Sequence, residues 1–164
     1  MMHQMFVYGT LKRGEPNNYL FQNPENGVGK YLCDGFTKNK YPLVIATRYN
    51  IPFLLYSPGR GGNVQGEIYE VDDLMLRRLD ILEGHPKYYK REQDEIYTSK
   101  PEGGAEPKTM KCWVYFLQNF KHELAEKPYL STYSSSGPHG LPYTHSAERD
   151  PSYDSRSEIK NDFR

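Results

Sequence analysis

The stretch Met5-Phe-Val-Tyr-Gly-Thr-Leu-Lys-Arg-Gly14 joins a short apolar run to a glycine break. Met5 to Tyr8 is apolar and aromatic, which is typical of a buried strand. Gly9 and Thr10 end that strand, and the residues after them turn polar and basic. A strand that stops at a glycine leaves successive backbone N–H groups without partners, and such a row of donors suits a carboxylate or another anion. The alternative interpretation is an ordinary N-terminal strand followed by its turn.

The charge balance and the cysteines limit the classes of protein to consider. The 164 residues include 21 basic and 21 acidic ones, so no global field attracts the chain to nucleic acid or to a membrane surface. Cys33 and Cys112 lack metal-ligand spacing, and we expect buried thiols of a reducing compartment, with a single disulfide as the alternative. Neither a leader-like segment nor about 18 consecutive apolar residues occur, so we expect a cytoplasmic protein.

Short apolar runs separated by turn residues predict a series of strands. These strands are expected at 30–36, 41–46, 51–56, 64–71, 92–98 and 110–117. The strand at 30–36 brings Cys33 inside, and the strand at 64–71 fits a hairpin with the one before it. So many short strands with one convincing helix predict an α+β fold built on a small barrel or curled sheet.

The chain divides by composition into an apolar part and a polar end. Residues 1–145 are predicted to form one domain, and residues 146–164 a polar, flexible tail that is disordered or lies on the surface. The connection at 99–108 is rich in Pro, Gly and Glu and is expected to be a mobile loop.

The convincing helix spans Asp72 to Glu83, with an aspartate cap at its start and Gly84 at its end. At about 100° per residue, one apolar stripe contains Met75, Leu76, Leu79 and Leu82 and faces the core. Glu83 points along the same stripe. Burial and the C-terminal end of the helix dipole both disfavour its charge and raise its pKa, which suits a general base. The alternative is a glutamate at a frayed helix end whose side chain reaches water.

Other residues carry weaker signals. The histidines have no spacing typical of metal sites, and no phosphate-binding loop, dinucleotide fingerprint or nucleophilic serine motif occurs, so no metal or cofactor is predicted. The turn-rich segment at 134–141 could close over a site, and we expect its residues Gly137 to Gly140 to do so, with Tyr143 packing nearby.

Phe6-Val-Tyr-Gly-Thr-Leu-Lys-Arg-Gly14 resembles the signature strand and loop of the γ-glutamylcyclotransferase-like family, which includes the plant AIG2-like proteins. Further segments are similar to the vertebrate branch of that family that acts on γ-glutamylamines. They include Gly66-Glu-Ile-Tyr-Glu-Val-Asp72 and Ser136-Gly-Pro-His-Gly-Leu141. The resemblance covers roughly residues 4 to 143, and the tail departs from it.

The resemblance implies a small mixed β-barrel with flanking helices and a ligand cavity at one end. It also implies cleavage of L-γ-glutamyl-ε-lysine, left from transglutaminase crosslinks, to 5-oxo-L-proline and L-lysine, without a cofactor or an obligate protein partner. Carried over by position, the substrate-binding loop is Tyr8, Gly9, Thr10 and Leu11, and the proton acceptor is Glu83. Two alternatives stay open: the same reaction on other γ-glutamyl amino acids or glutathione, and a non-catalytic module that binds a small ligand.

Overall fold

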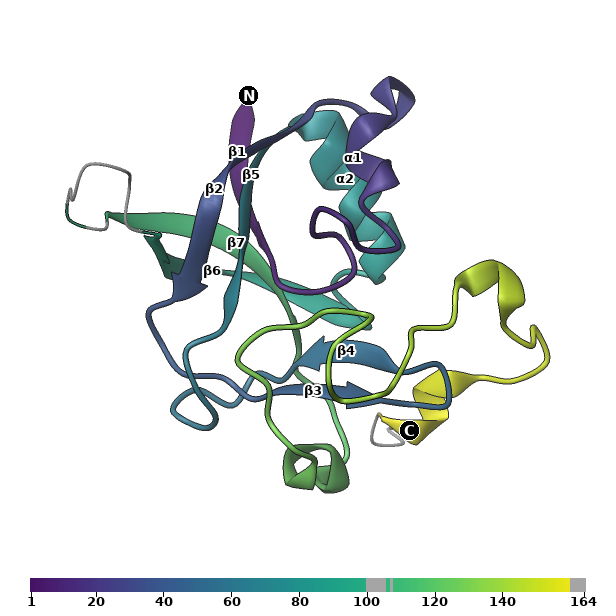
Figure 1. Ribbon diagram of the computed structural model, residues 1–164. Coiled ribbons are helices and arrows are strands. Elements are labelled where there is room, and N and C mark those ends of the chain that lie inside the picture. Colours follow the sequence, from purple (N-terminus) through teal and green to yellow (C-terminus); the bar gives the residue numbers. More distant parts are fainter. Residues whose placement is uncertain (100–105, 107, 160–164) are drawn as a thin grey trace.

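A closed barrel forms the centre of the computed structural model, which describes residues 1–99, 106 and 108–159 (Figure 1). Its strands follow the order β1-β5-β2-β6-β7 around the barrel. They are β1 (Met2–Val7), β2 (Gly29–Thr37), β5 (Gln65–Asp72), β6 (Tyr89–Thr98) and β7 (Thr109–Leu117). All neighbours are antiparallel except β1 and β7, which pair in parallel between Met5 and Trp113. The α+β fold with a small mixed β-barrel is therefore confirmed.

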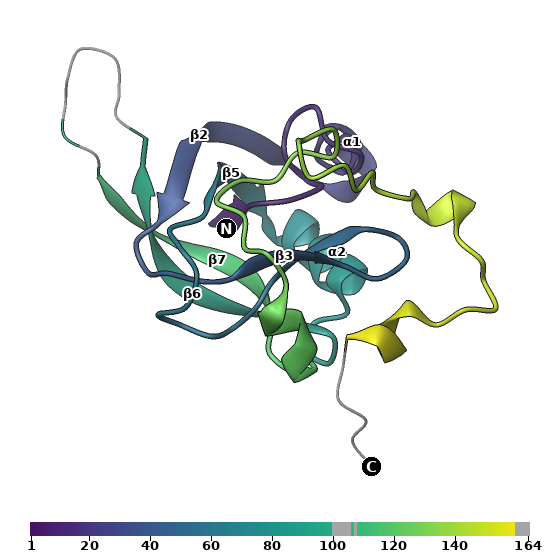
Figure 2. The ribbon, with the colours of Figure 1, turned by 60° about the horizontal axis from the view of Figure 1, so that its bottom comes forward.

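Helices and a separate hairpin flank the barrel. The α-helices α1 (Tyr19–Gln22) and α2 (Asp73–Glu83) lie together on one side, and the hairpin of β3 (Leu43–Ala46) and β4 (Ile51–Leu54) lies at one end (Figures 1 and 2). The short 3-10 helices are η1 (Pro24–Asn26), η2 (His122–Glu126), η3 (Ser146–Glu148) and η4 (Ser155–Glu158). No helix in the described part of the chain is long and apolar enough to span a membrane.

The second half of strand β1, from Met5 to Val7, is buried on both faces, which explains its apolar run. Met5 and Val7 belong to the hydrophobic cluster that includes residues of α2, whereas Phe6 and Tyr8 belong to a second cluster with residues of β6 and β7. Successive side chains of a strand point to opposite faces, so both faces of β1 need apolar residues. β1 therefore ends at Val7 between the two clusters, two residues before Gly9.

Helix α2 begins and ends as its sequence predicts. The Asp72 carboxylate accepts a hydrogen bond from the Met75 N–H at 2.8 Å, and Gly84 adopts a left-handed conformation with φ 64° after the last turn. Met75, Leu76 and Leu79 are buried. The predicted burial of Leu82 is wrong, because its side chain is 50% exposed.

The predicted hairpin between the strands at 51–56 and 64–71 is also wrong. Strand β4 pairs with β3, whereas β5 lies between β1 and β2. The turn after β4 folds back instead, and the Tyr41 N–H donates to the Gly62 carbonyl at 3.0 Å. A Cβ on Gly66 would lie 2.3 Å from the Val7 carbonyl oxygen, so glycine at this position lets β1 approach β5 closely.

The two cysteines are free thiols. Cys112 is buried on β7, but Cys33 is only half-buried because β2 has an irregular register between Tyr31 and Cys33. Cys33 is therefore inside only in part.

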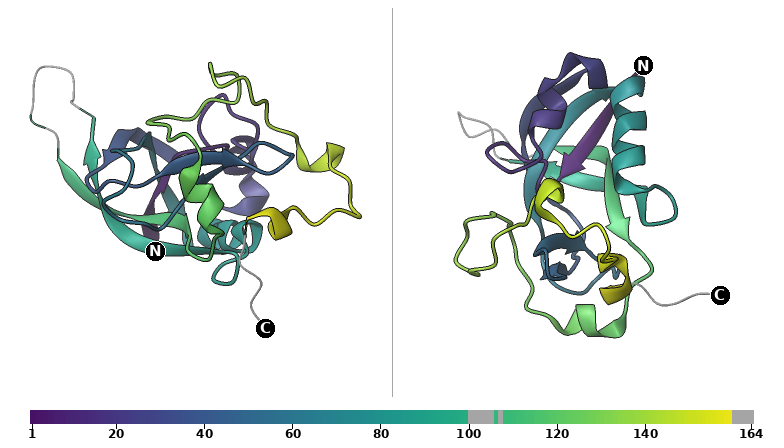
Figure 3. Two further views of the ribbon diagram at one scale, coloured as in Figure 1. Left: turned by 90° about the horizontal axis from the view of Figure 1, so that it is seen from below. Right: turned by 90° about the vertical axis from the view of Figure 1, so that its right-hand side faces the viewer.

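The C-terminal segment of residues 146–159 lies against the body on the side of α2 and the β3–β4 hairpin (Figure 3, right). Ile159 is fully buried, and its carbonyl accepts a hydrogen bond from the Lys121 N–H at 2.5 Å. The Arg48 guanidinium lies 3.3 Å from the ring centroid of Tyr153. The domain boundary at residue 145 stays a prediction, and most of the predicted loop at 99–108 lies outside the described residues.

Candidate active site

A cavity of about 230 Å³ is lined by residues from distant parts of the chain. It is lined by the ends of β1 and α2, by the start of β4, by residues of β6 and β7, and by the C-terminal segment. It brings together all the residues predicted from the sequence for binding and proton transfer: Tyr8, Gly9, Thr10, Leu11 and Glu83. Their functional roles remain predictions.

Glu83 is the last residue of α2 and lines the cavity one turn after the buried Leu79. Its side chain keeps some contact with the open space, yet the surrounding protein atoms desolvate the carboxylate and raise its pKa to about 7. Gly84, in a left-handed conformation, ends the helix directly after Glu83. The alternative of a side chain that escapes to water at a frayed helix end does not describe this arrangement.

The loop from Tyr8 to Leu11 is held by its carbonyls and side chains. The Gly9 carbonyl accepts from the Lys12 N–H at 3.1 Å, the Thr10 carbonyl from the Asn17 N–H at 2.8 Å, and the Leu11 carbonyl from the Asn18 side chain at 2.8 Å. Within the described residues, the backbone N–H groups of Gly9, Thr10 and Leu11 donate to no protein acceptor. These donors are available to a ligand.

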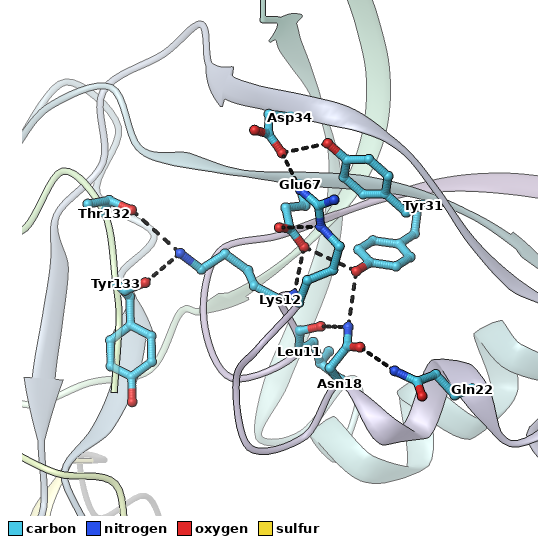
Figure 4. Close-up of polar contacts among 11 residues, drawn as sticks. Leu11, Lys12, Asn18, Gln22, Tyr31, Asp34, Glu67, Thr132 and Tyr133 are labelled. Atoms are coloured by element: carbon cyan, nitrogen blue, oxygen red, sulfur yellow. Dashed lines mark hydrogen bonds and ion pairs between the residues drawn. The ribbon is translucent and has the colours of Figure 1, made fainter. Parts of the chain in front are cut away.

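A buried polar network supports this loop from behind (Figure 4). The Glu67 carboxylate accepts from the backbone N–H of Arg13 at 2.9 Å and from its guanidinium at 3.1 Å. The Tyr69 hydroxyl also donates to Glu67, at 3.1 Å, and in turn accepts from the Asn18 amide at 3.0 Å. Because Asn18 also holds the Leu11 carbonyl, the network holds both Leu11 and Arg13 in the turn that follows β1.

The Lys12 side chain leaves the same turn toward Thr132 and Tyr133, away from Glu67 (Figure 4). Its ammonium donates to the Tyr133 carbonyl and lies 3.5 Å from the Thr132 hydroxyl. Lys12 and Arg13 therefore anchor the loop to two separate parts of the body.

A second carboxylate, Asp80, lies one helical turn before Glu83 and behaves in the opposite way. Burial alone would raise the pKa of Asp80, but hydrogen bonds from Arg91 and Tyr115 outweigh it and hold the pKa below its ordinary value. The Arg91 guanidinium donates to both carboxylate oxygens at 2.8 and 3.1 Å, and the Tyr115 hydroxyl donates to one of them at 2.6 Å. One turn of helix thus carries a carboxylate that stays ionised and another that is ready to take a proton near neutral pH.

Tyrosines form much of the cavity wall: Tyr8, Tyr88, Tyr89, Tyr115 and Tyr143. Burial raises the pKa values of Tyr8, Tyr88, Tyr89 and Tyr115, so these hydroxyls remain protonated at neutral pH. The Tyr8 hydroxyl donates to the Tyr115 carbonyl at 2.7 Å, which fixes the first residue of the loop. The Tyr143 hydroxyl accepts from the Asn17 amide at 3.3 Å, and the same amide lies 2.9 Å from the Thr10 hydroxyl oxygen.

The predicted cover of the cavity by Gly137 to Gly140 is wrong, since none of these residues lines it. The loop packs on its own side instead: the His139 ring stacks on Tyr133 with centroids 6.0 Å apart and bonds the Ser134 carbonyl at 2.7 Å. The predicted position of Tyr143 at the cavity is confirmed.

The C-terminal segment takes part in the wall through Arg149, Ser155 and Arg156. This contribution could not be predicted, because a polar segment without periodicity does not reveal where it docks. The Asn17-Asn18 pair and Glu67 were also missed. No sequence signal separates Glu67 from Glu70 of the same strand, although Glu67 is buried in the fold.

Among the described residues, no group of three or more His, Cys, Asp or Glu side chains is placed to hold a metal ion.

Comparisons with known proteins agree on one family. The family model described as Gamma-glutamyl cyclotransferase, AIG2-like, matches residues 5–135. A putative gamma-glutamylcyclotransferase of Drosophila melanogaster is 48% identical over 136 residues, which are 83% of this chain and 83% of that protein. The gamma-glutamylaminecyclotransferase of Mus musculus is 44% identical over 143 residues, covering 87% of this chain and 96% of that protein. The crystal structure of an AIG2-like protein from Mus musculus matches with a TM-score of 0.84 and 42% identity, over 90% of this chain and 99% of that one.

Proposed function

We propose that this chain, which belongs to the γ-glutamyl cyclotransferase, AIG2-like family, converts L-γ-glutamyl-ε-lysine to 5-oxo-L-proline and L-lysine. The family and its relatives support a cyclotransferase that acts on γ-glutamylamines. The single observation that carries the proposal is that Glu83 and the loop from Tyr8 to Leu11 line one cavity. L-γ-glutamyl-ε-lysine is the γ-glutamylamine that digestion of transglutaminase-crosslinked proteins releases.

The reaction uses two groups of the substrate itself. The α-amine nitrogen attacks the γ-carbonyl carbon and forms the bond that closes the five-membered ring. The bond between the γ-carbon and the lysine ε-nitrogen then breaks. The α-ammonium loses two protons as it becomes the ring N–H, and the amide nitrogen gains two as it becomes the ε-ammonium of lysine, so a single group that accepts and returns protons in turn balances the reaction.

Glu83 suits that role because of its raised pKa. A free α-ammonium has a pKa of about 8. Proton transfer from it to the Glu83 carboxylate, whose pKa is about 7, is therefore uphill by only about 1.4 kcal/mol. Transfer to an ordinary carboxylate of pKa 4.5 would be uphill by about 5 kcal/mol. Desolvation of Glu83 therefore lowers the cost of generating the nucleophile. The protonated Glu83 can then deliver the proton to the leaving ε-amine, which departs poorly as an anion.

The loop from Tyr8 to Leu11 would hold the γ-glutamyl group. Its backbone N–H groups at Gly9, Thr10 and Leu11 suit either the α-carboxylate or the oxygen that becomes negative as the ring closes. The surrounding tyrosine rings limit the entry of water. Holding the amine and the carbonyl in contact supplies several kcal/mol toward ring closure.

The test is release of 5-oxoproline by the wild-type protein and by Glu83→Gln. We expect the wild type to release 5-oxoproline and lysine from γ-glutamyl-ε-lysine, and the variant to lose at least about a hundredfold in kcat, a typical contribution of general acid–base catalysis. Glu123→Gln, a change at an exposed glutamate in η2, is the matched control and should retain full activity. Retained turnover in Glu83→Gln would overturn the role of Glu83.

The same assay separates the alternatives. γ-Glutamyl-ε-lysine, γ-glutamyl-alanine and glutathione are compared at equal concentrations, and product confined to glutathione would overturn the substrate assignment. Stoichiometric binding of these compounds with no product over long incubation would instead indicate the non-catalytic module.

A further inference from the structure

Two arginines of the C-terminal segment, Arg149 and Arg156, line the cavity beside Tyr143 and Tyr88. Both lie beyond residue 135, where the match to the family model ends. They therefore belong to a part of the wall that the family pattern does not specify, contributed by the segment that crosses the side of the molecule in Figure 3.

Aromatic rings and a backbone carbonyl hold these arginines in place. The Arg149 guanidinium lies 5.0 Å and 5.1 Å from the ring centroids of Tyr49 and Tyr143, and its Nε donates to the Thr144 carbonyl at 2.9 Å. The Arg156 guanidinium lies 4.7 Å from the ring centroid of Tyr88. Arg156 belongs to η4, which is followed at once by the buried Ile159. The two cations are thus tethered to the cavity without using all their donors.

Neither guanidinium forms an ion pair within the described part of the chain. In contrast, Arg13 and Arg91 pair with Glu67 and Asp80. The Asp154 carboxylate accepts from the backbone N–H of Arg156, not from its side chain. The cavity wall therefore presents positive charge that no carboxylate of the described residues neutralises by direct contact.

Tyr88 is close enough to both Glu83 and the two arginines to feel their charges. Burial raises the pKa of Tyr88 most, Glu83 also raises it, and Arg156 and Arg149 lower it, so the Tyr88 hydroxyl feels both kinds of charge. The raised pKa of Glu83 follows from burial, with no opposing cation. Among the described residues, neither Arg149 nor Arg156 lies within ion-pair distance of the Glu83 carboxylate, although all three line the same cavity.

We infer that Arg149 and Arg156 bind a carboxylate on the leaving amine and so select γ-glutamylamines whose amine part is an amino acid. The inference rests on the proposed cyclotransferase activity. The glutamyl α-carboxylate is one carbon away from the α-amine that must reach Glu83, and the backbone N–H groups of Gly9, Thr10 and Leu11 are its proposed donors. In γ-glutamyl-ε-lysine, four methylene groups and the α-carbon separate the scissile nitrogen from the lysine carboxylate. That carboxylate reaches away from Glu83, toward unpaired guanidinium groups that bind carboxylates well.

The experiment compares γ-glutamyl-ε-lysine with mono-γ-glutamylcadaverine, which is the same molecule without the lysine carboxylate. The wild type should prefer γ-glutamyl-ε-lysine by at least about tenfold in kcat/KM, as expected for hydrogen bonds to a charged group. In the double variant Arg149→Gln/Arg156→Gln, that preference should fall by about tenfold while kcat/KM for the cadaverine compound is unchanged or higher. Arg149→Lys/Arg156→Lys keeps both charges and should retain most of the preference.

Arg48→Gln provides the control for a purely structural effect, because Arg48 holds Tyr153 of the same segment but does not line the cavity. It should leave the preference intact. An unchanged preference in the double glutamine variant, an equal fall for both substrates, or an equal loss of preference in Arg48→Gln would each overturn the inference. Absence of 5-oxoproline from both compounds with the wild type would instead overturn the proposed function itself.

Discussion

Replacing Glu83 with glutamine should stabilise the protein at alkaline pH, although it removes the proposed base. The Glu83 carboxyl has its pKa raised from 4.5 to about 7 by burial, so the folded protein holds a proton there more tightly than the unfolded chain does. Between these two pKa values the native state binds more protons, and stability falls as pH rises through this window. The glutamine side chain does not titrate, so it escapes that loss.

The size of the effect follows from the two pKa values. A tenfold change in proton affinity is worth about 1.4 kcal/mol, so ionised Glu83 costs about 3 kcal/mol above pH 7. At pH 5 most of this cost is absent, because the carboxyl is protonated in the folded protein. The stability difference between Glu83→Gln and the wild type should therefore grow by about 2–3 kcal/mol from pH 5 to pH 8.

Urea unfolding at both pH values measures this difference directly. The quantity that matters is the change between pH 5 and pH 8, because any fixed difference in hydrogen bonding between Glu and Gln cancels. Glu123→Gln, at an exposed position, serves as the control and should show no such growth.

A stability difference that stays constant between pH 5 and pH 8 would refute the reasoning. It would mean that the Glu83 carboxylate is solvated in the folded protein, and the argument for a base of raised pKa would fail with it. A difference that shrinks with pH would indicate that a cation stabilises the ionised form.

The polar network and the docked segment make two further predictions. Glu67→Gln should lower kcat/KM for γ-glutamyl-ε-lysine and reduce the free energy of unfolding by about 1–3 kcal/mol, because Glu67 accepts from Arg13 and Tyr69 behind the loop. Glu95→Gln, whose partner Lys38 is exposed, should cost less than about 1 kcal/mol in urea unfolding, and equal losses would contradict the role of the network. Ile159→Ala should weaken the hold of the C-terminal segment by about 2–5 kcal/mol, because the side chain is fully buried. Limited proteolysis should then cleave within residues 146–159 faster than in the wild type, and unchanged cleavage would count against this docking.

The parts of the site that the sequence predicted are those with strong local rules. The apolar run before Gly9 identified β1, and the aspartate cap and Gly84 bounded α2. Periodicity then placed Glu83 on the inward side of the helix. Because both elements end where their sequence signals end, the two candidate regions could be named before they were known to lie together.

The rest depends on contacts between distant residues. Strand β5 has the alternation of a hairpin partner, but its real neighbours are β1 and β2, and no local signal distinguishes these pairings. Leu82 follows the helical period, yet it lies at the end of the helix where the barrel no longer covers it. The docking of residues 146–159 rests on the single buried side chain of Ile159 and on arginines over tyrosine rings, which composition does not reveal.

The length of helix α2 sets the position of Glu83 relative to Asp72, the last residue of β5. Asp72 fixes its first turn and Gly84 its last, and the carboxylate of Glu83 reaches the cavity only at this number of residues. One inserted or deleted residue would rotate Glu83 by about 100° and shift it by about 1.5 Å along the axis. Surviving variants of this protein should therefore change length in the connections between strands, and the count of residues from Asp72 to Glu83 should stay the same.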